Sequence, residues 1–156
     1  MKLAFWWIGK TSEKYLSQGI SIYNNRLKHY ASCELMVFKD IKKNCNIEQR
    51  IELEGKTILK SIEINDFLVL CDEKGNNPDS IELSRHLEKW LMDSRFKKVI
   101  FLVCGAYGAS DEVKSRANFT LSLSALTFSH QMVRLFLLEQ VYRAFTIIRN
   151  EKYHNV

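Results

Sequence analysis

From residue 99 to residue 110 the chain reads VIFLVCGAYGAS, an apolar run followed by a glycine-rich turn and a serine. Six consecutive apolar residues, with no polar alternation, are typical of a strand that is buried on both faces. Gly105 and Gly108 predict a loop directly after this strand, and Ser110 is suited to cap a short helix that follows. Strands buried on both faces belong to parallel sheets that lie between two layers of helices.

The same alternation of apolar runs and helical periods continues on both sides of this stretch. Besides residues 99–104, strands are predicted at residues 3–8, 33–38, 67–71 and 121–123. Helices are predicted at residues 12–30, 47–62, 79–93, 110–117 and 129–149. We therefore expect one α/β domain over residues 1–156, with a mostly parallel sheet and helices on both faces.

Composition and cysteine spacing exclude several classes of protein. With 46% hydrophobic and 26% charged residues among 156, the chain is not intrinsically disordered, and its length suits one domain. The four cysteines include no C-x-x-C pair and the four histidines no H-x-x-x-H pair, so we expect no metal site. Unpaired cysteines suit a reducing compartment, which predicts a cytoplasmic protein. The apolar N-terminal stretch is too short for a signal peptide, and no segment has the roughly 20 apolar residues of a membrane span.

The net charge of +5 is concentrated in the C-terminal part of the chain. Residues 113–156 carry six basic and two acidic residues, a surplus of +4, whereas the other residues carry 17 basic and 16 acidic ones. The basic residues of this segment are Lys114, Arg116, Arg134, Arg143, Arg149 and Lys152. We expect an anionic partner to contact the segment. Elsewhere, Lys42 and Lys43 lie in a polar stretch that is expected to be a mobile loop.

The last predicted helix is apolar in nearly every direction. Its apolar residues are Met132, Val133, Leu135, Phe136, Leu137, Leu138, Val141, Tyr142, Ala144, Phe145, Ile147 and Ile148. A helix on the surface of a monomer would keep one polar face. The pattern favours a homodimer interface that covers the helix from a second side. The alternative is a helix that is central to the monomer's own fold.

Ligands of such sheets bind beyond the carboxyl ends of the strands, which selects the loops after Cys71, Cys104 and Leu123. Residues 72–78 are turn-rich and are expected to form the first of these loops. Gly105-x-x-Gly108 could let an anion or nucleotide approach the main chain, or it forms a plain strand-to-helix turn. The serine and threonine hydroxyls that follow the last strand could hold a polar ligand or cap the next helix.

Charged residues of the last helix also have two interpretations. His130 and Arg134 share one helix face, whereas Arg143 lies about half a turn out of phase with Arg134. Arg143 could instead pair with Glu139 one turn earlier, and His130 could be a polar residue at a helix start. The tail at Tyr153-His154 is either frayed or folds over a site, which could belong to the other subunit.

One long block carries a family resemblance: LSLSALTFSHQ at residues 121–131, then Arg134, then EQVYRA at residues 139–144, and finally Tyr153-His154. In these residues the chain closely resembles the RlmH family, the large-subunit ribosomal RNA pseudouridine N3-methyltransferases of the SPOUT class. The likeness extends over the whole chain. It implies an α/β fold with a C-terminal trefoil knot, a homodimer, and S-adenosyl-L-methionine bound at the knot near the subunit interface. It also implies methylation at N3 of a pseudouridine in 23S ribosomal RNA of the assembled ribosome.

Carried over by position, the family's cofactor contacts fall on the three loops selected above. The implied contacts are Cys71, Cys104, Gly105, Leu123, Ser124, Ala125, Leu126, Thr127 and Phe128, with Gly108 supporting the turn. The chain departs from the family at Cys71, where leucine is usual, and at Cys104-Gly105, where two glycines are usual. Asn76 and Ser129 stand where the family usually has lysine and proline. At Cys104 a side chain is expected where the main chain should approach the cofactor.

The resemblance also implies catalytic residues in the C-terminal block. N3 of pseudouridine must lose a proton as it attacks the methyl group, and His130 or His154 is expected to accept it. Arg134 or Arg143 is expected to stabilise the deprotonated base by its charge. Tyr153 is expected to stack on the base.

The implied partner accounts for the basic C-terminal segment. Ribosomal RNA is expected to meet the dimer near the knot and the tail, and phosphate contacts would make binding weaken as salt rises. Two other functions stay open. One is a non-catalytic RNA- or ribosome-binding factor on the same fold, which Cys104 favours. The other is a flavin- or nucleotide-binding domain, which the fold alone favours.

Overall fold

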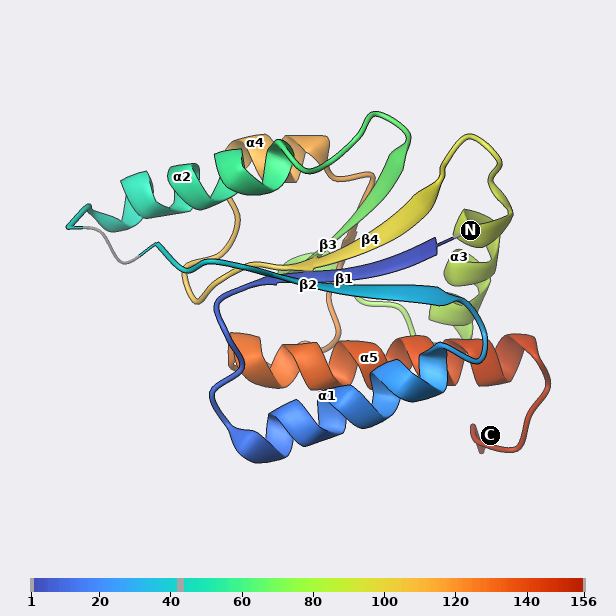
Figure 1. Ribbon diagram of the computed structural model, residues 1–156. Coiled ribbons are helices and arrows are strands. Elements are labelled where there is room, and N and C mark those ends of the chain that lie inside the picture. Colours follow the sequence, from blue (N-terminus) through green and yellow to red (C-terminus); the bar gives the residue numbers. More distant parts are fainter. Residues whose placement is uncertain (1, 42–43, 156) are drawn as a thin grey trace.

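Five parallel strands form the sheet around which the structure, a computed structural model, is built (Figure 1). It describes residues 2–41 and 44–155, so the loop predicted at Lys42 and Lys43 lies outside the described residues. The strands are β1 (Lys2–Ile8), β2 (Ser32–Phe38), β3 (Asp66–Asn76), β4 (Lys98–Val103) and β5 (Phe119–Leu121). Their order across the sheet is β2-β1-β4-β3-β5, and every neighbouring pair is parallel. The predicted α/β class with a parallel sheet is therefore confirmed.

Helices cover both faces of the sheet, as the apolar strands predict. On one face lie α1 (Lys14–Leu27), α3 (Ser80–Met92) and α5 (His130–Ile148), and on the other lie α2 (Ile47–Leu59) and α4 (Asp111–Arg116) (Figure 1). Side chains alternate along β1, so that Phe5 and Trp7 pack toward α1 and α5 while Trp6 and Ile8 pack toward α2 and α4. Nearly the whole strand is thereby buried.

Three predicted helix starts are confirmed by their caps. The Ser110 hydroxyl accepts from the N–H of Val113, and Ser129 caps α5 in the same way. Asp79 and Glu82 form a reciprocal capping box at α3. The start predicted at Ser12 is wrong, because α1 begins at Lys14. Both the N–H and the hydroxyl of Ser12 donate instead to the side-chain oxygen of Gln131, at 2.9 and 3.0 Å.

The strand β3 is longer than predicted and replaces much of the expected loop at residues 72–78. Its last residue, Asn76, pairs with Leu121 of β5, and the Asn76 carbonyl accepts from the N–H of Ser122 at 2.7 Å. A Cβ on Gly75 would lie 2.7 Å from the carbonyl carbon and oxygen of Thr120, so only glycine allows this close approach. β5 is correspondingly displaced from residues 121–123 to 119–121. A contact between strands far apart in sequence fixes both boundaries.

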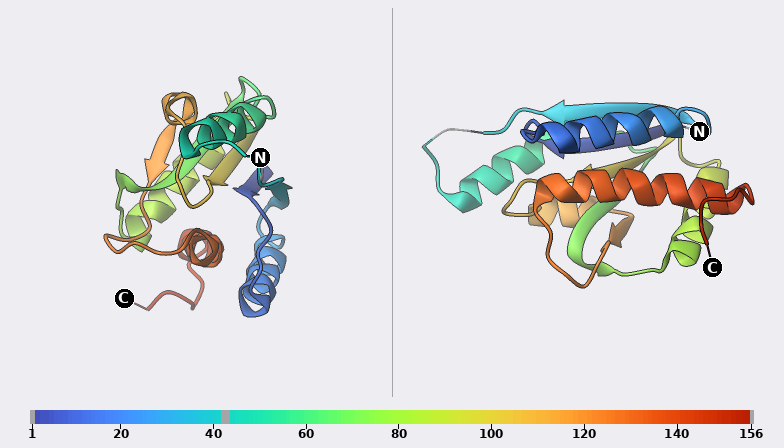
Figure 2. Two further views of the ribbon diagram at one scale, coloured as in Figure 1. Left: turned by 90° about the vertical axis from the view of Figure 1, so that its left-hand side faces the viewer. Right: turned by 90° about the horizontal axis from the view of Figure 1, so that it is seen from below.

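The helix α5 is central to the monomer. It packs against α1 and α3 as well as the sheet, and Figure 2 shows it alongside α1. Leu137, Leu138, Val141 and Ala144 are completely buried. The monomer's own core therefore takes up much of the apolar surface that suggested a dimer. No described helix is long and apolar enough to cross a membrane.

Candidate active site

Cys71 lies within β3, so no loop directly follows it as predicted, and Cys104 directly follows the neighbouring β4; their side chains point to opposite faces of the sheet. Cys71 on β3 packs toward α3 and α5, whereas Cys104, directly after β4, is buried among side chains beneath α2 and α4. Burial raises the pKa of the Cys71 thiol and raises the pKa of Cys104 to about 12, so both stay protonated at neutral pH. The Cys104 side chain packs in the core and so does not cover the following Gly105, whose carbonyl accepts from the N–H of Gly108 at 3.0 Å.

The loop between β5 and α5 is shaped by its own hydroxyl groups. The Ser122 hydroxyl donates to the Ser124 carbonyl, and the Ser124 hydroxyl accepts from the N–H of Leu126, both at 2.9 Å. Thr127 donates to the Glu73 carboxylate at 2.9 Å. These hydroxyls therefore fix the shape of the loop. This role is neither of the two that the sequence suggested for them, which were binding a polar ligand and capping the next helix.

Several main-chain groups of this loop remain free to bind a ligand. Among the residues that the structure describes, the N–H and C=O groups of Leu123, Thr127 and Phe128 have no hydrogen-bond partner. Leu126 between them is 70% exposed. A loop with free donors and acceptors beside apolar side chains suits a planar heterocycle with polar edges.

A cleft of about 1340 Å³ opens next to the loop that follows β4. It lies at the carboxyl ends of β1, β2 and β4, between α1 and α2, and we call it the α1–α2 cleft. Gly105, Ala106 and Tyr107 form part of its wall, so it adjoins one of the predicted cofactor loops. Its ionisable and aromatic side chains include Lys10, Lys39, Arg50, Glu54, Tyr107 and His130.

His130 is the one predicted catalytic residue that lines this cleft. It is the first residue of α5 and is partly buried. Burial, and then the charge of Arg134, lower the pKa of the His130 ring. The imidazole is therefore neutral at neutral pH and able to accept a proton.

Arg134 is fully buried and holds α5 to the end of β1. Its guanidinium donates to the Ile8 carbonyl at 2.7 Å and to the Thr11 hydroxyl at 2.9 Å, and it lies 5.4 Å from the centre of the Trp7 ring. Burial lowers the pKa of Arg134 to about 10. Arg134 and His130 share a helix side, as predicted, but only His130 lines the cleft.

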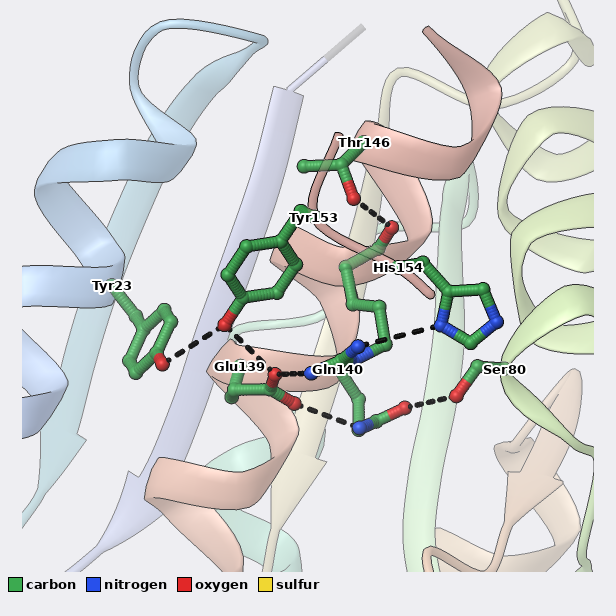
Figure 3. Close-up of polar contacts among 8 residues, drawn as sticks. Tyr23, Ser80, Glu139, Gln140, Thr146, Tyr153 and His154 are labelled. Atoms are coloured by element: carbon green, nitrogen blue, oxygen red, sulfur yellow. Dashed lines mark hydrogen bonds and ion pairs between the residues drawn. The ribbon is translucent and has the colours of Figure 1, made fainter. Parts of the chain in front are cut away.

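Arg143, Tyr153 and His154 form one polar cluster with Glu139, which we call the tail cluster. Figure 3 shows Tyr153 and His154 folded back against α5. Arg143 donates to Glu139 at 2.5 Å, which confirms the ion-pair interpretation, and contacts His154 Nδ1 at 3.3 Å. The Tyr153 hydroxyl donates to the same carboxylate at 3.0 Å, and its ring lies 4.7 Å from the guanidinium. The tail is therefore ordered rather than frayed.

Further contacts occupy the second carboxylate oxygen of Glu139 in the tail cluster. The Gln140 amide donates to the second Glu139 oxygen at 2.7 Å and accepts from Ser80 at 2.8 Å (Figure 3). The bond to Glu139 raises the pKa of Arg143, while burial and bonds to Tyr23 and Glu139 raise the pKa of Tyr153. The rise of the helix puts Arg143 roughly 20 Å along α5 from His130. One monomer thus holds the five predicted catalytic residues in three separate places.

The basic surplus of the C-terminal segment is partly used inside the molecule. Arg134 is buried, and Arg143 is paired with Glu139. Arg116 donates to the main-chain carbonyls of Glu63 and Asp66, both at 2.9 Å. Only part of the counted charge is therefore available to an anionic partner.

Three residues that line the cleft, Arg50, Glu54 and Tyr107, were not among the site residues predicted from the sequence. An arginine and a glutamate four residues apart on an amphipathic helix are ordinarily a solvent-exposed pair. The signal that could have found them is Gly55, a helix-interior glycine directly after Glu54, since such a glycine commonly has a packing reason. Among the residues that the structure describes, no group of His, Cys, Asp and Glu side chains could hold a metal ion.

Comparisons with known proteins identify the family. The model of the family described as "Predicted SPOUT methyltransferase" matches residues 1–154. "Ribosomal RNA large subunit methyltransferase H" of Christiangramia forsetii is 47% identical over 150 residues, 95% of each chain. The protein of that name from Parabacteroides distasonis is 46% identical over 157 residues, 99% of each chain.

Two solved structures are more distantly similar. A probable methylase family protein from Haemophilus influenzae has a TM-score of 0.48 and 11% identity, covering 99% of this chain and 70% of that one. The SpoU methyltransferase AviRb from Streptomyces viridochromogenes, in complex with AdoMet, has a TM-score of 0.42 and 12% identity, covering 90% and 56%. The full-length sequence matches decide the assignment. The chain belongs to the SPOUT methyltransferase family, and to the same family within it as the ribosomal RNA large subunit methyltransferases H that its C-terminal block resembles.

Proposed function

We propose that the protein transfers the methyl group of S-adenosyl-L-methionine to N3 of a pseudouridine in 23S ribosomal RNA of the assembled ribosome. The observation that carries this proposal is the turn at Gly105–Tyr107. It belongs to one of the predicted cofactor loops and also lines the cleft that contains His130, whose pKa is lowered. The relatives named ribosomal RNA large subunit methyltransferase H support the class of substrate.

The loops at the ends of β3, β4 and β5 fit the cofactor. The free main-chain groups of Leu123, Thr127 and Phe128 match the donors and acceptors of an adenine edge. Cys71 lies on β3, which pairs with β5, and Gly105 follows β4, the next strand across the sheet. The side chain of Cys104 takes no space from the cofactor, because its thiol is buried in the core. The bound cofactor supplies an electrophilic methyl group.

His130 is suited to take the N3 proton of the target base. Its ring is neutral and lines the cleft. The residue begins α5, which the hydrogen bond from Arg134 to the Ile8 carbonyl holds against the end of β1. Arg134 acts on the reaction by positioning that helix. His154 is the weaker candidate acceptor, because Nδ1 is engaged with Arg143.

A homodimer could bring the tail cluster to the active site of the other subunit. Leu126 is 70% and Phe136 36% exposed, and the rings of Phe128 and Phe136 are in contact, with centroids 4.9 Å apart. This apolar patch next to the cofactor loop supports a dimer contact there. Arg143, Tyr153 and His154 would then act in trans. A ribosomal substrate and four unpaired cysteines support a cytoplasmic location.

Methyl transfer from labelled cofactor to ribosomes, free subunits and naked ribosomal RNA tests the proposal. We expect label at N3 of one pseudouridine of 23S RNA, strongest with assembled ribosomes. No label on any substrate, together with no cofactor binding in calorimetry, would favour the non-catalytic RNA-binding factor. The feature that favoured that factor, a side chain at position 104, lies in the core.

A further inference from the structure

We propose that the α1–α2 cleft seats the target base and that Glu54 selects pseudouridine over uridine. In this proposal a Glu54 carboxylate oxygen accepts a hydrogen bond from N1–H of the base. It rests on the proposed function, and it assigns the specificity to a residue outside the C-terminal block.

The packing of α2 places the Glu54 carboxylate beside the loop that follows β4. A Cβ on Gly55 would overlap the Ser110 hydroxyl, so the glycine lets α2 lie directly on the start of α4. Glu54, the preceding residue, is 7% exposed. Its Oε2 lies 3.5 Å from the position that a Cβ on Gly105 would take, where cleft and predicted cofactor loop meet.

One oxygen of this buried carboxylate is free. Oε1 accepts from Arg50 Nε at 3.2 Å, whereas Oε2 has no hydrogen-bond partner among the described residues. Arg50 also pairs with Asp40, so its charge is shared between two carboxylates. Oε2 is not one of the fully buried polar atoms without a partner, so it opens to the cleft and is available to a ligand group that donates a hydrogen bond.

The rest of the cleft suits a nucleotide. Tyr107 is 54% exposed and its ring lies 5.8 Å from the Arg50 guanidinium, which leaves ring surface for a base to stack on. Lys10 and Lys39 are exposed at the rim, where they can contact phosphate groups. His130 lines the same cleft.

The chemistry of the base explains why an acceptor would be selective. Pseudouridine is attached to ribose through C5, so it carries N1–H where uridine presents a C–H group. N3–H is common to both bases and cannot distinguish them. A uridine in the cleft would cover Glu54 Oε2, displace its water and offer no donor in exchange. Sites built to hydrogen-bond a substrate group reject analogues that lack the group for this reason.

The test compares ribosomes that carry pseudouridine at the target position with ribosomes that carry uridine there. The measured quantity is the ratio of kcat/KM on the two substrates. We expect Glu54→Leu to lower this ratio roughly tenfold to a hundredfold, and Glu54→Gln, whose amide oxygen still accepts, to keep most of it. The control Glu52→Leu changes an exposed glutamate of the same helix and should leave the ratio unchanged.

Cofactor calorimetry and thermal melting of each variant check the fold. If Glu54→Leu does not fold, Glu54→Asp, which withdraws the carboxylate by one methylene, should lower the same ratio. A Glu54 variant that slows both substrates equally, or leaves the ratio unchanged, overturns the inference. Chemical-shift titration with pseudouridine and uridine 5′-monophosphates tests the cleft apart from catalysis. Suppose that the wild-type protein binds pseudouridine monophosphate more tightly than uridine monophosphate, with shifts at Tyr107 and Glu54, but labels no ribosome. That result contradicts the proposed function and leaves the assignment of the cleft standing.

Discussion

Two trios of arginine, glutamate and tyrosine occur in the molecule and differ in how far their hydrogen-bonding groups are already occupied. The cleft trio is Arg50, Glu54 and Tyr107, and the tail trio is Glu139, Arg143 and Tyr153. In both, the charged pair is four residues apart on a helix and the tyrosine ring packs on the guanidinium. In the tail trio both oxygens of the glutamate are hydrogen-bonded, whereas in the cleft trio one oxygen is free and the tyrosine is exposed.

The difference shows that the residue types of a cluster do not reveal its use. What separates the two trios is whether their hydrogen-bonding capacity is already filled by the protein. Within the monomer the filled cluster fixes the tail on α5, whereas the unfilled cluster lies beside a cavity and has an acceptor available to a ligand. Four predictions test this contrast.

The largest expected effect separates the two histidines next to the trios. We expect His130→Ala to lower kcat on ribosomes by roughly 10²- to 10³-fold, because the neutral ring in the cleft no longer accepts the proton. His154→Ala should lower it by less than about tenfold, since His154 is held by Arg143. Unchanged cofactor affinity in calorimetry serves as the control. A larger loss of kcat for His154→Ala than for His130→Ala would identify His154 as the proton acceptor.

The second effect is on stability and distinguishes the two glutamates. Glu139→Leu should lower the free energy of unfolding by about 2 kcal/mol, because it leaves Arg143 and Tyr153 without their shared acceptor. Glu54→Leu should cost less than about 1 kcal/mol, since Arg50 keeps Asp40 as a partner. Urea denaturation measures both. Equal losses would mean that the two carboxylates have the same structural role.

A smaller effect is expected at the two tyrosine hydroxyls. Tyr153→Phe should lower stability by about 1 kcal/mol, since it removes the bonds to Glu139 and Tyr23 at 3.0 and 3.2 Å. Tyr107→Phe should leave stability unchanged, because the Tyr107 hydroxyl has no hydrogen-bond partner among the described residues. It should also keep the stacking surface, whereas Tyr107→Ala should raise KM. No difference between the two phenylalanine variants would contradict the contrast.

The smallest effect concerns pH. The pKa of His130 is lowered in the folded protein, so the unfolded chain binds the proton first as the pH falls. The contribution of His130 to stability is complete above its ordinary pKa of about 6.5 and is lost as the pH falls through the folded value. His130→Gln should flatten this part of the curve of unfolding free energy against pH. A curve identical to wild type would argue that the ring is not desolvated.

Much of the fold could be predicted because the strands are apolar on both faces. That pattern requires two layers of helices, and the serine and aspartate caps mark where helices begin. The errors lie where distant segments meet. Ser12 bonds to Gln131 instead of capping a helix, and Asn76 is drawn into β3 by its pairing with Leu121. The residues around Ser12 and Asn76 do not indicate that Gln131 and Leu121 will be their partners.

The candidate site was predicted less completely, because sequence spacing does not show how a side chain's bonds are filled. The rule that ligands bind at the carboxyl ends of parallel strands located the loops. It could not show that Arg134 is buried, that Arg143 is paired with Glu139, or that Cys104 points into the core. Glu54 was missed because its significance depends on its approach to Gly105 across the fold.

The bonds of Arg134 to Ile8 and Thr11 also constrain the order in which the chain can fold. They join residues that are 126 and 123 positions apart, and the Ser12 to Gln131 bond spans 119. During synthesis β1 emerges first, yet its α5 face stays uncovered until the last helix has been made. Contacts of such long sequence separation slow folding. The first strand, which is an interior strand of the sheet, is therefore among the last elements to be completed.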